Sequence, residues 1–556
     1  MRVNVIRDPG SSSVVRGQSA VCSTDNTIVT DTVLRVLREG GNAFDAAVAA
    51  CIVQATVEPF MTTHAGTVTF LGYEAATGAL HALDSQGTIP AGLPLFQPVP
   101  PLAGGIYSQP GFQPSGAIPG FMPGLKAIYE RFCTKPWAWL VDEAIGWAED
   151  GHLVSSFEHQ MYVETMPFSA YFPEGQEFFM PGGFIPPVGS RFRSLPLAQT
   201  LRALAAEGPD CFIDGTWARH LVEKANAMDW PIALEHLAVA PRWTEPLRYR
   251  HRGYELVHLP LPQATGLISM LVLGVISNVE DAAGPLDTPA AVRAMSHALR
   301  LALQQSGYVN DPQHFETPLD TWLDPAFHRH LASLVARSMP RVDLTDHVAK
   351  TWGPARLTAA GVPYTRAQAV AQPAGSCELA IVDDRGNWVQ MMNTLQSGGI
   401  PGMVVDGVHM VGSHATPGSL SSWMNTWLTP GHKMRSVIGN TIALRDGKPA
   451  FSLGTPGIPH VTVPQVLTNI IERGMDFAEA AEAPRMLPLG DDNALTVENR
   501  LSVETKRGLT ARGLKLTSTY AYDYHMGSFQ IAWREASGKL GAFADLRRCG
   551  VAGGLT

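Results

Sequence analysis

The sequence predicts an α+β protein in which helices and sheets form layers built from both parts of the chain. Helical patterns dominate before about residue 375, and strand patterns dominate after it. Strand candidates nevertheless occur on both sides of this junction. We therefore expect the strands of the two parts to share one layered domain that contains the junction.

The first strong periodic pattern lies near the N-terminus. Val33, Leu34 and Leu37 fall on one helical face, and Gly40-Gly41 ends that helix. Residues 45–53 are almost all apolar and small, which is typical of a buried, closely packed helix. The later elements predicted in this part are a strand at 68–73, a mostly irregular stretch from 79 to 116, helices at 125–131 and 137–149, and a mostly helical region at 155–375.

Two strands are predicted directly after residue 375. Residues 379–382 and 388–392 are apolar runs, and Asp383-Asp384-Arg385-Gly386-Asn387 between them is a turn sequence that favours a β-hairpin. The other elements predicted in this part are strands at 441–444, 450–453, 516–520 and 529–533 and a helix at 463–473.

Composition excludes several classes of function. The net charge is −9, from 41 basic and 50 acidic side chains, which argues against a nucleic-acid or anionic-membrane surface. The longest apolar stretch, 267–276, is about half as long as a bilayer-spanning helix, so a buried core segment is expected there and not a membrane helix. Six scattered cysteines form no CxxC pair, so the common zinc motifs are absent and a reducing compartment is expected. The first ten residues lack the apolar core of a secretory signal, and we expect a cytoplasmic protein.

Several sequence blocks follow one another along the chain. They are Gly40-Gly41-Asn42-Ala43-Phe44-Asp45 with Val57-Glu58-Pro59, Ala117-Ile118-Pro119-Gly120 with residues 144–151, Leu261-Pro262-Gln263-Ala264-Thr265-Gly266, Glu482-Ala483-Pro484-Arg485 and Ala544-Asp545-Leu546-Arg547-Arg548-Cys549-Gly550. Together they resemble the γ-glutamyltranspeptidase family over roughly residues 15–555.

The resemblance implies an N-terminal nucleophile hydrolase with a four-layer αββα sandwich and an added helical region in the N-terminal part. Such a proenzyme cuts itself once, here into a large subunit, 1–375, and a small subunit, 376–556. The two subunits are expected to stay together as a heterodimer, and further oligomerisation is left open. No metal or cofactor is expected for this fold, and the expected binding partner is a small-molecule amide substrate.

By this resemblance the nucleophile is Ser376, and Gly375–Ser376 is the cleavage site. A hydroxyl needs an adjacent base, and the freed α-amino group, with a pKa of about 8, can supply one. Two alternatives remain: Ser376 is a turn residue, or Cys377 is the nucleophile after cleavage one bond later. Glu378 stands where the family usually has His. Because of this departure, a third alternative is a relative that does not cut itself.

Two other positions match the catalytic machinery of the family. Thr394 matches a Thr whose hydroxyl supports the nucleophile, and its alternative role is that of a β-branched strand residue. Gly457 and Ile458 match a Gly-rich loop whose backbone N–H groups would face the oxyanion. The same Pro-Gly sequence is also typical of a plain turn.

The substrate-binding positions depart from the family pattern. Gln86 replaces an Arg, Ser436 and Val437 replace a Ser pair, and Gln396 replaces an Asn. Met424-Asn425-Thr426-Trp427 replaces a Met-Asp-Asp-Phe stretch. Each charge-assisted hydrogen bond lost costs on the order of 1.5–3 kcal/mol, so we predict poor activity on γ-glutamyl amides.

A neutral, apolar or short acyl group is expected instead. Trp423, Met424, Trp427 and Val437 would supply apolar lining, with core packing as their alternative role. Lys433 and Arg435 would replace the missing Arg if the acyl group were acidic. His64 and His460 border the same blocks and are candidates for substrate contact or for a structural role.

Three functions follow from these observations. The leading hypothesis is an acylase or amidohydrolase that forms an acyl-enzyme on Ser376 and releases it to water. The second is a γ-glutamyl hydrolase or transpeptidase with a rebuilt pocket. The third is a non-catalytic relative that keeps the fold and does not cut itself.

Overall fold

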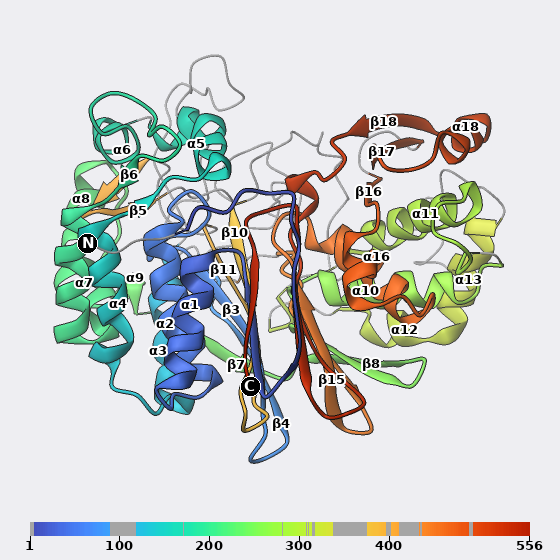
Figure 1. The fold of residues 1–556 in the computed structure, drawn as a ribbon, viewed down its shortest axis with the longest axis horizontal. Helices are drawn as coiled ribbons and strands as arrows, with labels where there is room; N and C mark the ends of the chain where they lie inside the picture. The colour runs from blue at the N-terminus through green and yellow to red at the C-terminus, as the bar shows by residue number, and fades with distance from the viewer. Residues whose placement is uncertain are drawn as a thin grey trace.

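Two seven-stranded β-sheets pack face to face, and a layer of helices covers the outer side of each (Figure 1). The computed structural model describes residues 5–88, 118–170, 172–238, 240–280, 282–306, 309, 311–313, 317–336, 375–395, 402–410, 433, 436–488 and 493–556. All neighbouring strands in both sheets are antiparallel. The predicted αββα sandwich is confirmed.

One sheet, called sheet I, interleaves strands from before and after residue 375. Its order is β21-β2-β10-β11-β3-β4-β7. The strands are β2 (Ala20–Thr24), β3 (Thr67–Glu74), β4 (Ala79–Asp84), β7 (Arg242–Thr244), β10 (Ser376–Val382), β11 (Trp388–Thr394) and β21 (Val551–Leu555). Because β10 and β11 lie between β2 and β3, hydrogen bonds join the two parts of the chain into one sheet.

The facing sheet, called sheet II, also draws on both parts of the chain. Its order is β1-β20-β19-β15-β14-β9-β8. The strands are β1 (Ser13–Gln18), β8 (Leu247–His251), β9 (Tyr254–His258), β14 (Thr441–Arg445), β15 (Lys448–Gly454), β19 (Gln530–Arg534) and β20 (Leu540–Ala544). The space between the sheets holds small and branched apolar side chains, among them Val21, Leu71, Ala380, Val382, Ile442 and Ala542.

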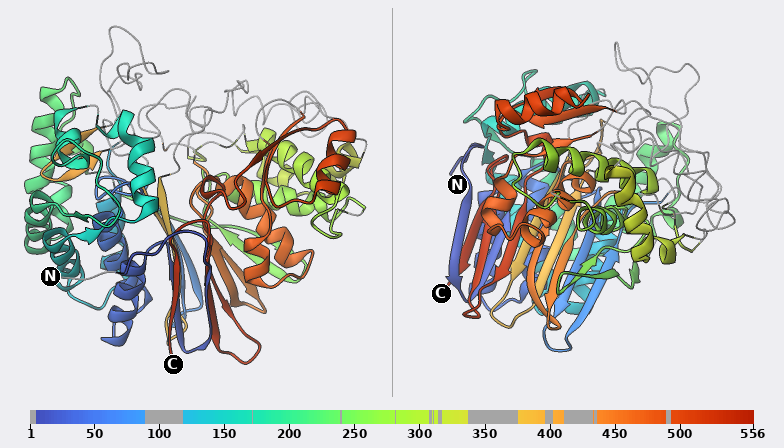
Figure 2. Two further views of the ribbon diagram at one scale, coloured as in Figure 1. Left: turned by 45° about the horizontal axis from the view of Figure 1, so that its top comes forward. Right: turned by 90° about the vertical axis from the view of Figure 1, so that its right-hand side faces the viewer.

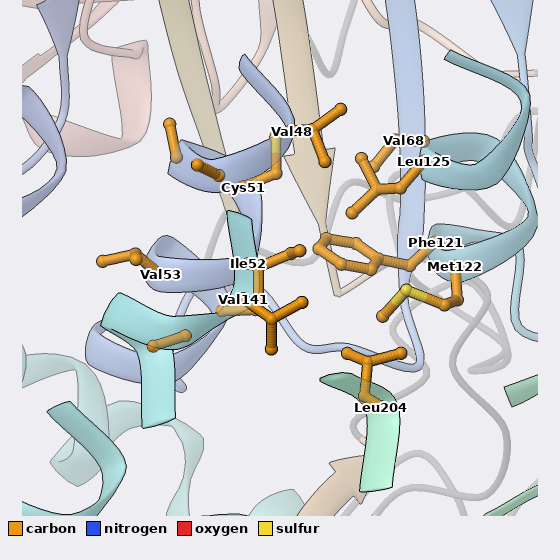
Figure 3. Packing of buried hydrophobic residues seen from close by; sticks show 14 of the residues in the cluster. Val48, Cys51, Ile52, Val53, Val68, Phe121, Met122, Leu125, Val141 and Leu204 are labelled. Carbon is orange, nitrogen blue, oxygen red and sulfur yellow. The ribbon is translucent and has the colours of Figure 1, made fainter. Parts of the chain in front are cut away.

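Sheet I is covered by α1 (Thr27–Arg38), α2 (Ala43–Val57), α3 (Phe121–Phe132) and α4 (Trp137–Asp150). Helix α2 begins at a capping box, in which Asn42 accepts from the backbone of Asp45 and Asp45 accepts from the backbone of Asn42. Every residue of α2 is buried, as the run of small apolar residues predicts. Figure 3 shows its side chains meeting those of α3 in the core.

The outer face of sheet II is covered by α10 (Thr265–Ile276), α11 (Pro289–Ser306), α13 (Pro325–Ala336) and α16 (Pro459–Ile471). The added helical region includes α7 (Leu195–Glu207), which packs on α4, α8 (Thr216–Ala227), and α5 (Ser156–Ser169), which lies nearer the sheets than α7 (Figure 1 and Figure 2). Among the described helices, none has both the length and the apolar composition that crossing a membrane requires.

Two predictions about local structure omit strands that the structure contains. The stretch from 79 to 116 is predicted to be mostly irregular, but residues 79–84 form β4. The region 155–375 is predicted to be mostly helical, but it also contains β7 and the hairpin of β8 and β9. These short segments have weak patterns of their own. Strand β4 is stabilised by pairing with β7, and β9 is stabilised by pairing with β14, and both partners are distant in sequence.

Candidate active site

The first residue of β10, Ser376, lies directly opposite Thr394, the last residue of β11. Side chains alternate between the two faces of a strand. Ala380 and Val382 of β10 pack between the sheets, whereas Leu379 packs against the helices. The hydroxyl of Ser376 therefore faces sheet II, where it is 6% exposed.

Three oxygen atoms form a small triangle at the junction. Ser376 Oγ lies 2.8 Å from Thr394 Oγ1 and 2.6 Å from the carbonyl oxygen of Gly375. Thr394 Oγ1 lies 2.7 Å from the same carbonyl oxygen. One arrangement of protons satisfies all three atoms: Ser376 donates to Thr394, and Thr394 donates to the Gly375 carbonyl. The nucleophile candidate, its supporting hydroxyl and the bond to be cut are thus brought together.

Cys377, the alternative nucleophile, lies on the opposite face of β10. It is fully buried among apolar side chains, and its Sγ donates to Glu58 Oε2 at 3.5 Å. Burial and the adjacent carboxyl of Glu58 raise the pKa of the Cys377 thiol well above its usual value. Since the thiolate is the reactive form, this environment disfavours a nucleophilic role.

Two residues that the sequence analysis missed hold the backbone of this segment. Arg548 Nη1 donates to the carbonyl oxygen of Ser376 at 2.8 Å. Asp25 Oδ2 accepts from the backbone N–H of Glu378 at 2.8 Å. Burial raises the pKa of Asp25 to about 6, although Arg548 opposes the shift. Arg548 lies in the last of the sequence blocks that resemble the family, whereas no sequence pattern indicated Asp25. The folded positions of β2 and β21 bring both residues to the site.

Glu378, which replaces the His of the family, points into the sandwich two residues beyond Ser376. Its Oε1 accepts from Gln390 Nε2 at 2.6 Å and from Asn440 Nδ2 at 2.7 Å. Burial, with a contribution from Asp25, raises the pKa of Glu378 well above its usual value. This carboxyl joins β10 and β11 of sheet I to the segment before β14 of sheet II.

The candidate oxyanion loop follows β15, which packs closely on β10. A Cβ added at Gly454 would lie 2.2 Å from Glu378 Oε1, so only glycine permits this approach. Gly457 has a φ of +86°, and a Cβ there would lie 2.9 Å from the backbone nitrogen of Gly527. Ile458 is buried as the N-cap residue of α16. The loop lies at the Ser376 end of the sandwich, and the role of its two N–H groups stays a prediction.

Two segments of the candidate substrate pocket are joined by hydrogen bonds. Asp84 Oδ2 accepts from Gln263 Nε2 at 3.1 Å, and Gln263 Oε1 accepts from the backbone of Ile438 at 3.1 Å. The segments that carry Gln86 and the Ser436-Val437 pair are therefore connected through Gln263. Ser436 is fully buried, and Val437 belongs to the core of sheet II. Other candidates lie outside the described residues: Gln396, Trp423, Met424, Asn425, Thr426, Trp427 and Arg435.

The remaining candidates are held by protein groups. Lys433 Nζ donates to the carbonyl oxygen of Asp84, so its ammonium is already paired. His64 Nε2 lies 3.2 Å from the carbonyl oxygen of Ile52, and burial lowers its pKa to about 4. His460 is buried in α16, and burial lowers its pKa to about 4 as well. These environments favour structural roles for both histidines.

Glu58 predicts a pH dependence of stability. Burial, with Asp25 nearby, raises its pKa from 4.5 to about 7. Between these pH values the folded chain binds more protons than the unfolded chain, so stability falls as pH rises through this window and levels off above it. We expect Glu58 to contribute a loss on the order of 3 kcal/mol from pH 4.5 to 7.

The measurement is urea unfolding at several pH values of the Ser376→Ala chain, with and without Glu58→Gln. Glu58→Gln should reduce the loss of stability between pH 5 and 8. The matched control is Glu130→Gln at an exposed position of α3, which should leave the pH profile unchanged. Identical profiles for Glu58→Gln and the control would contradict the prediction.

Comparisons with known proteins identify the family and the fold of this chain. The family model described as gamma-glutamyltranspeptidase matches residues 30–555. The "Acylase ACY 1 proenzyme" of Pseudomonas sp. (strain SE83) is 26% identical over 523 residues, covering 90% of this chain and 88% of that protein. The "Glutathione hydrolase proenzyme" of Pseudomonas aeruginosa is 28% identical over 485 residues, covering 81% of this chain and 80% of that protein. The crystal structure of cephalosporin acylase from Bacillus halodurans shows the same fold, with a TM-score of 0.80 at 21% identity. The match covers 99% of this chain and 98% of that chain.

Proposed function

This chain belongs to the gamma-glutamyltranspeptidase family of N-terminal nucleophile hydrolases, which act on amide bonds, and we propose that Ser376 is its nucleophile. In this proposal the chain cuts its own Gly375–Ser376 bond and then hydrolyses a small-molecule amide. The observation that carries the proposal is the triangle of Ser376 Oγ, Thr394 Oγ1 and the Gly375 carbonyl oxygen.

Self-cleavage follows from that triangle. Ser376 Oγ attacks the carbonyl carbon of Gly375, while Thr394 donates to the carbonyl oxygen and stabilises the charge that develops there. The C–N bond breaks, the nitrogen takes the hydroxyl proton, and an ester remains. Water hydrolyses the ester, leaving a carboxylate on Gly375 and a free amine and hydroxyl on Ser376. The products are the large subunit 1–375 and the small subunit 376–556.

The two subunits would remain associated after the cut. Strands β10 and β11 of the small subunit lie between β2 and β3 of the large subunit, and sheet II is mixed in the same way. Separation would break both sheets and expose the apolar core between them. A stable heterodimer is therefore the expected mature form.

Turnover uses the amine that cleavage releases. The α-amino group, with a pKa of about 8, takes the proton of Ser376 Oγ as the oxygen attacks the substrate carbonyl. The N–H groups of Gly457 and Ile458 would donate to the resulting oxyanion. The proton then passes to the departing amine, an acyl ester forms on Ser376, and water releases the acid. Hydrolysis matches the acylase name of one relative.

The acyl group in this proposal is neutral and is not γ-glutamyl. Gln86 lies where the family has Arg, and Val437 replaces one of two serines. Two relatives are named glutathione hydrolase and acylase, so family membership alone leaves both substrate classes open. The departures at Gln86 and Val437 favour the acylase.

We also propose a cytoplasmic location. All six cysteines are free thiols, and five of them are buried. Free thiols in this number are typical of a reducing compartment.

The direct test is intact-mass spectrometry of the purified protein after incubation at neutral pH. Two fragments that split after Gly375 are expected. The cut protein should then hydrolyse a γ-glutamyl anilide far more slowly than a dedicated γ-glutamyl enzyme does, because the charged partners of the γ-glutamyl group are missing.

Each part of the proposal has its own contradicting result. A split after Ser376 would assign the nucleophile to Cys377. A single chain of 59.8 kDa would support a relative that does not process itself. Rapid turnover of the γ-glutamyl anilide by the cut protein would support a rebuilt γ-glutamyl pocket instead.

A further inference from the structure

Gln86 carries a buried side-chain amide that no described residue satisfies. The residue is 3% exposed, and within the described part of the chain neither its Nε2 nor its Oε1 has a hydrogen-bond partner. Burying an amide without a partner is unfavourable, and native proteins rarely leave such a group unpaired. A donor and an acceptor left unpaired at one position are suited to a ligand that offers one of each.

The register of sheet I aligns Gln86 with the nucleophile. Ser376 lies opposite Thr394, and Thr394 lies opposite Thr67. Strand β4 ends at Asp84, which pairs with Thr69 of β3. Because the two strands are antiparallel, Gln86, two residues after Asp84, lies level with Thr67. Neighbouring strands are about 4.8 Å apart, which places Gln86 roughly 14 Å across the sheet from Ser376.

The alternation of side chains puts this amide on the inner face of the sheet. Asp84 points inward and accepts from Gln263 of the opposite layer at 3.1 Å. Ser85 points outward and donates to the carbonyl oxygen of Gly120 at the start of α3. Its backbone N–H also donates to the Val68 carbonyl oxygen at 3.1 Å, so the segment is fixed on both sides. Gln86 follows Asp84 on the inner face, the side of the candidate nucleophile.

The described charges around Gln86 balance. Lys433 donates to the Asp84 carbonyl oxygen, and its Nζ lies 3.9 Å from Asp84 Oδ2. Arg242 pairs with Asp311 at 2.9 Å, and Asp311 also accepts from the backbone of Lys433 at 3.1 Å. Two cations therefore meet two carboxylates. Among the described residues, no unpaired cation remains here for a carboxylate of the substrate.

We propose that Gln86 binds the far end of the acyl group and that this end is a neutral carboxamide. A carboxamide accepts from Nε2 through its C=O and donates to Oε1 through its N–H, whereas a carboxylate only accepts and an alkyl group does neither. This proposal rests on hydrolysis at Ser376 and adds the chemical class of the acyl group.

The test compares three anilides of equal shape: 4-carbamoylbutanoyl, glutaryl and 5-methylhexanoyl. The cut wild-type enzyme should have a kcat/KM for the carbamoyl compound at least about tenfold above the other two, the effect of one or two hydrogen bonds. Gln86→Leu should reduce the ratio of carbamoyl to alkyl turnover by about 10–100-fold. The matched control, Gln160→Leu at an exposed position of α5, should keep the wild-type ratio.

A preference for the glutaryl or the alkyl anilide would overturn the proposal, as would an unchanged ratio in Gln86→Leu. If the chain stays uncut or cleaves none of the three anilides, the proposed hydrolysis fails separately, and calorimetry with glutaramide decides about Gln86. The Ser376→Ala chain should bind glutaramide, and adding Gln86→Leu should weaken binding at least about tenfold. No binding, or equal binding by both chains, would reject the site.

Discussion

Ser376→Ala should leave one uncut chain without amidase activity, whereas Cys377→Ala should be cut and should turn over substrate nearly as wild type does. The hydroxyl of Ser376 lies 2.8 Å from Thr394 Oγ1 and faces the space between the sheets. The thiol of Cys377 is fully buried on the other face of the same strand. In the proposed mechanism, alanine at 376 removes the oxygen atom that attacks Gly375 and forms the acyl-enzyme.

Intact mass and anilide turnover measure the two effects in each variant. Ser376→Thr serves as the conservative control, because it keeps the hydroxyl and should still be cut. Cleavage of Ser376→Ala, together with an uncut Cys377→Ala chain, would move the nucleophile by one residue. Uncut chains for all variants and for wild type would reject self-processing altogether.

The sequence predicts the hairpin of β10 and β11 from a local feature, its turn, whereas the roles of Ser376 and Thr394 come from the resemblance to the family. The turn at Asp383–Asn387 closes a hairpin of β10 and β11 whose register continues without a bulge for seven pairs. Counting outward from that turn reaches Ser376 opposite Thr394. The buried helix α2 is predictable for a similar reason, since its small apolar residues and its Asn42 cap are local signals.

The groups that surround this pair are not predictable from local pattern. Asp25 and Arg548 are separated by almost the whole chain, yet both contact residues 376–378 because β2 pairs with β10 and β21 pairs with β2 in the folded sheet. The short strands β8 and β9 were missed because pairing with β14 stabilises them. The unpaired state of Gln86 is likewise a property of its surroundings, whereas its replacement of an Arg is visible in the sequence.

A buried ionic network supports the site from the C-terminal part of the chain. Arg547 donates to both carboxylate oxygens of Glu498, at 2.6 and 2.7 Å, and to Asp545 at 3.1 Å. Burial opposes ionisation of Asp545, but Arg485 and Arg547 outweigh it and lower its pKa. Arg485 also donates to the carbonyl oxygen of Gly527, the residue that packs on Gly457. The network therefore supports the candidate oxyanion loop. Arg548, the residue after Arg547, donates to the carbonyl oxygen of Ser376.

Arg547→Met should lower stability by about 3–5 kcal/mol, because it leaves the carboxylates of Glu498 and Asp545 buried with fewer partners. Thermal unfolding in the Ser376→Ala background measures the effect without self-cleavage. Arg512→Met, an exposed arginine that donates to the Gly508 carbonyl oxygen, is the matched control and should shift the midpoint little. If Arg547→Met does not fold, Glu498→Gln tests the same network with almost unchanged shape. Midpoints for both variants within the range of the control would show that the network contributes little stability.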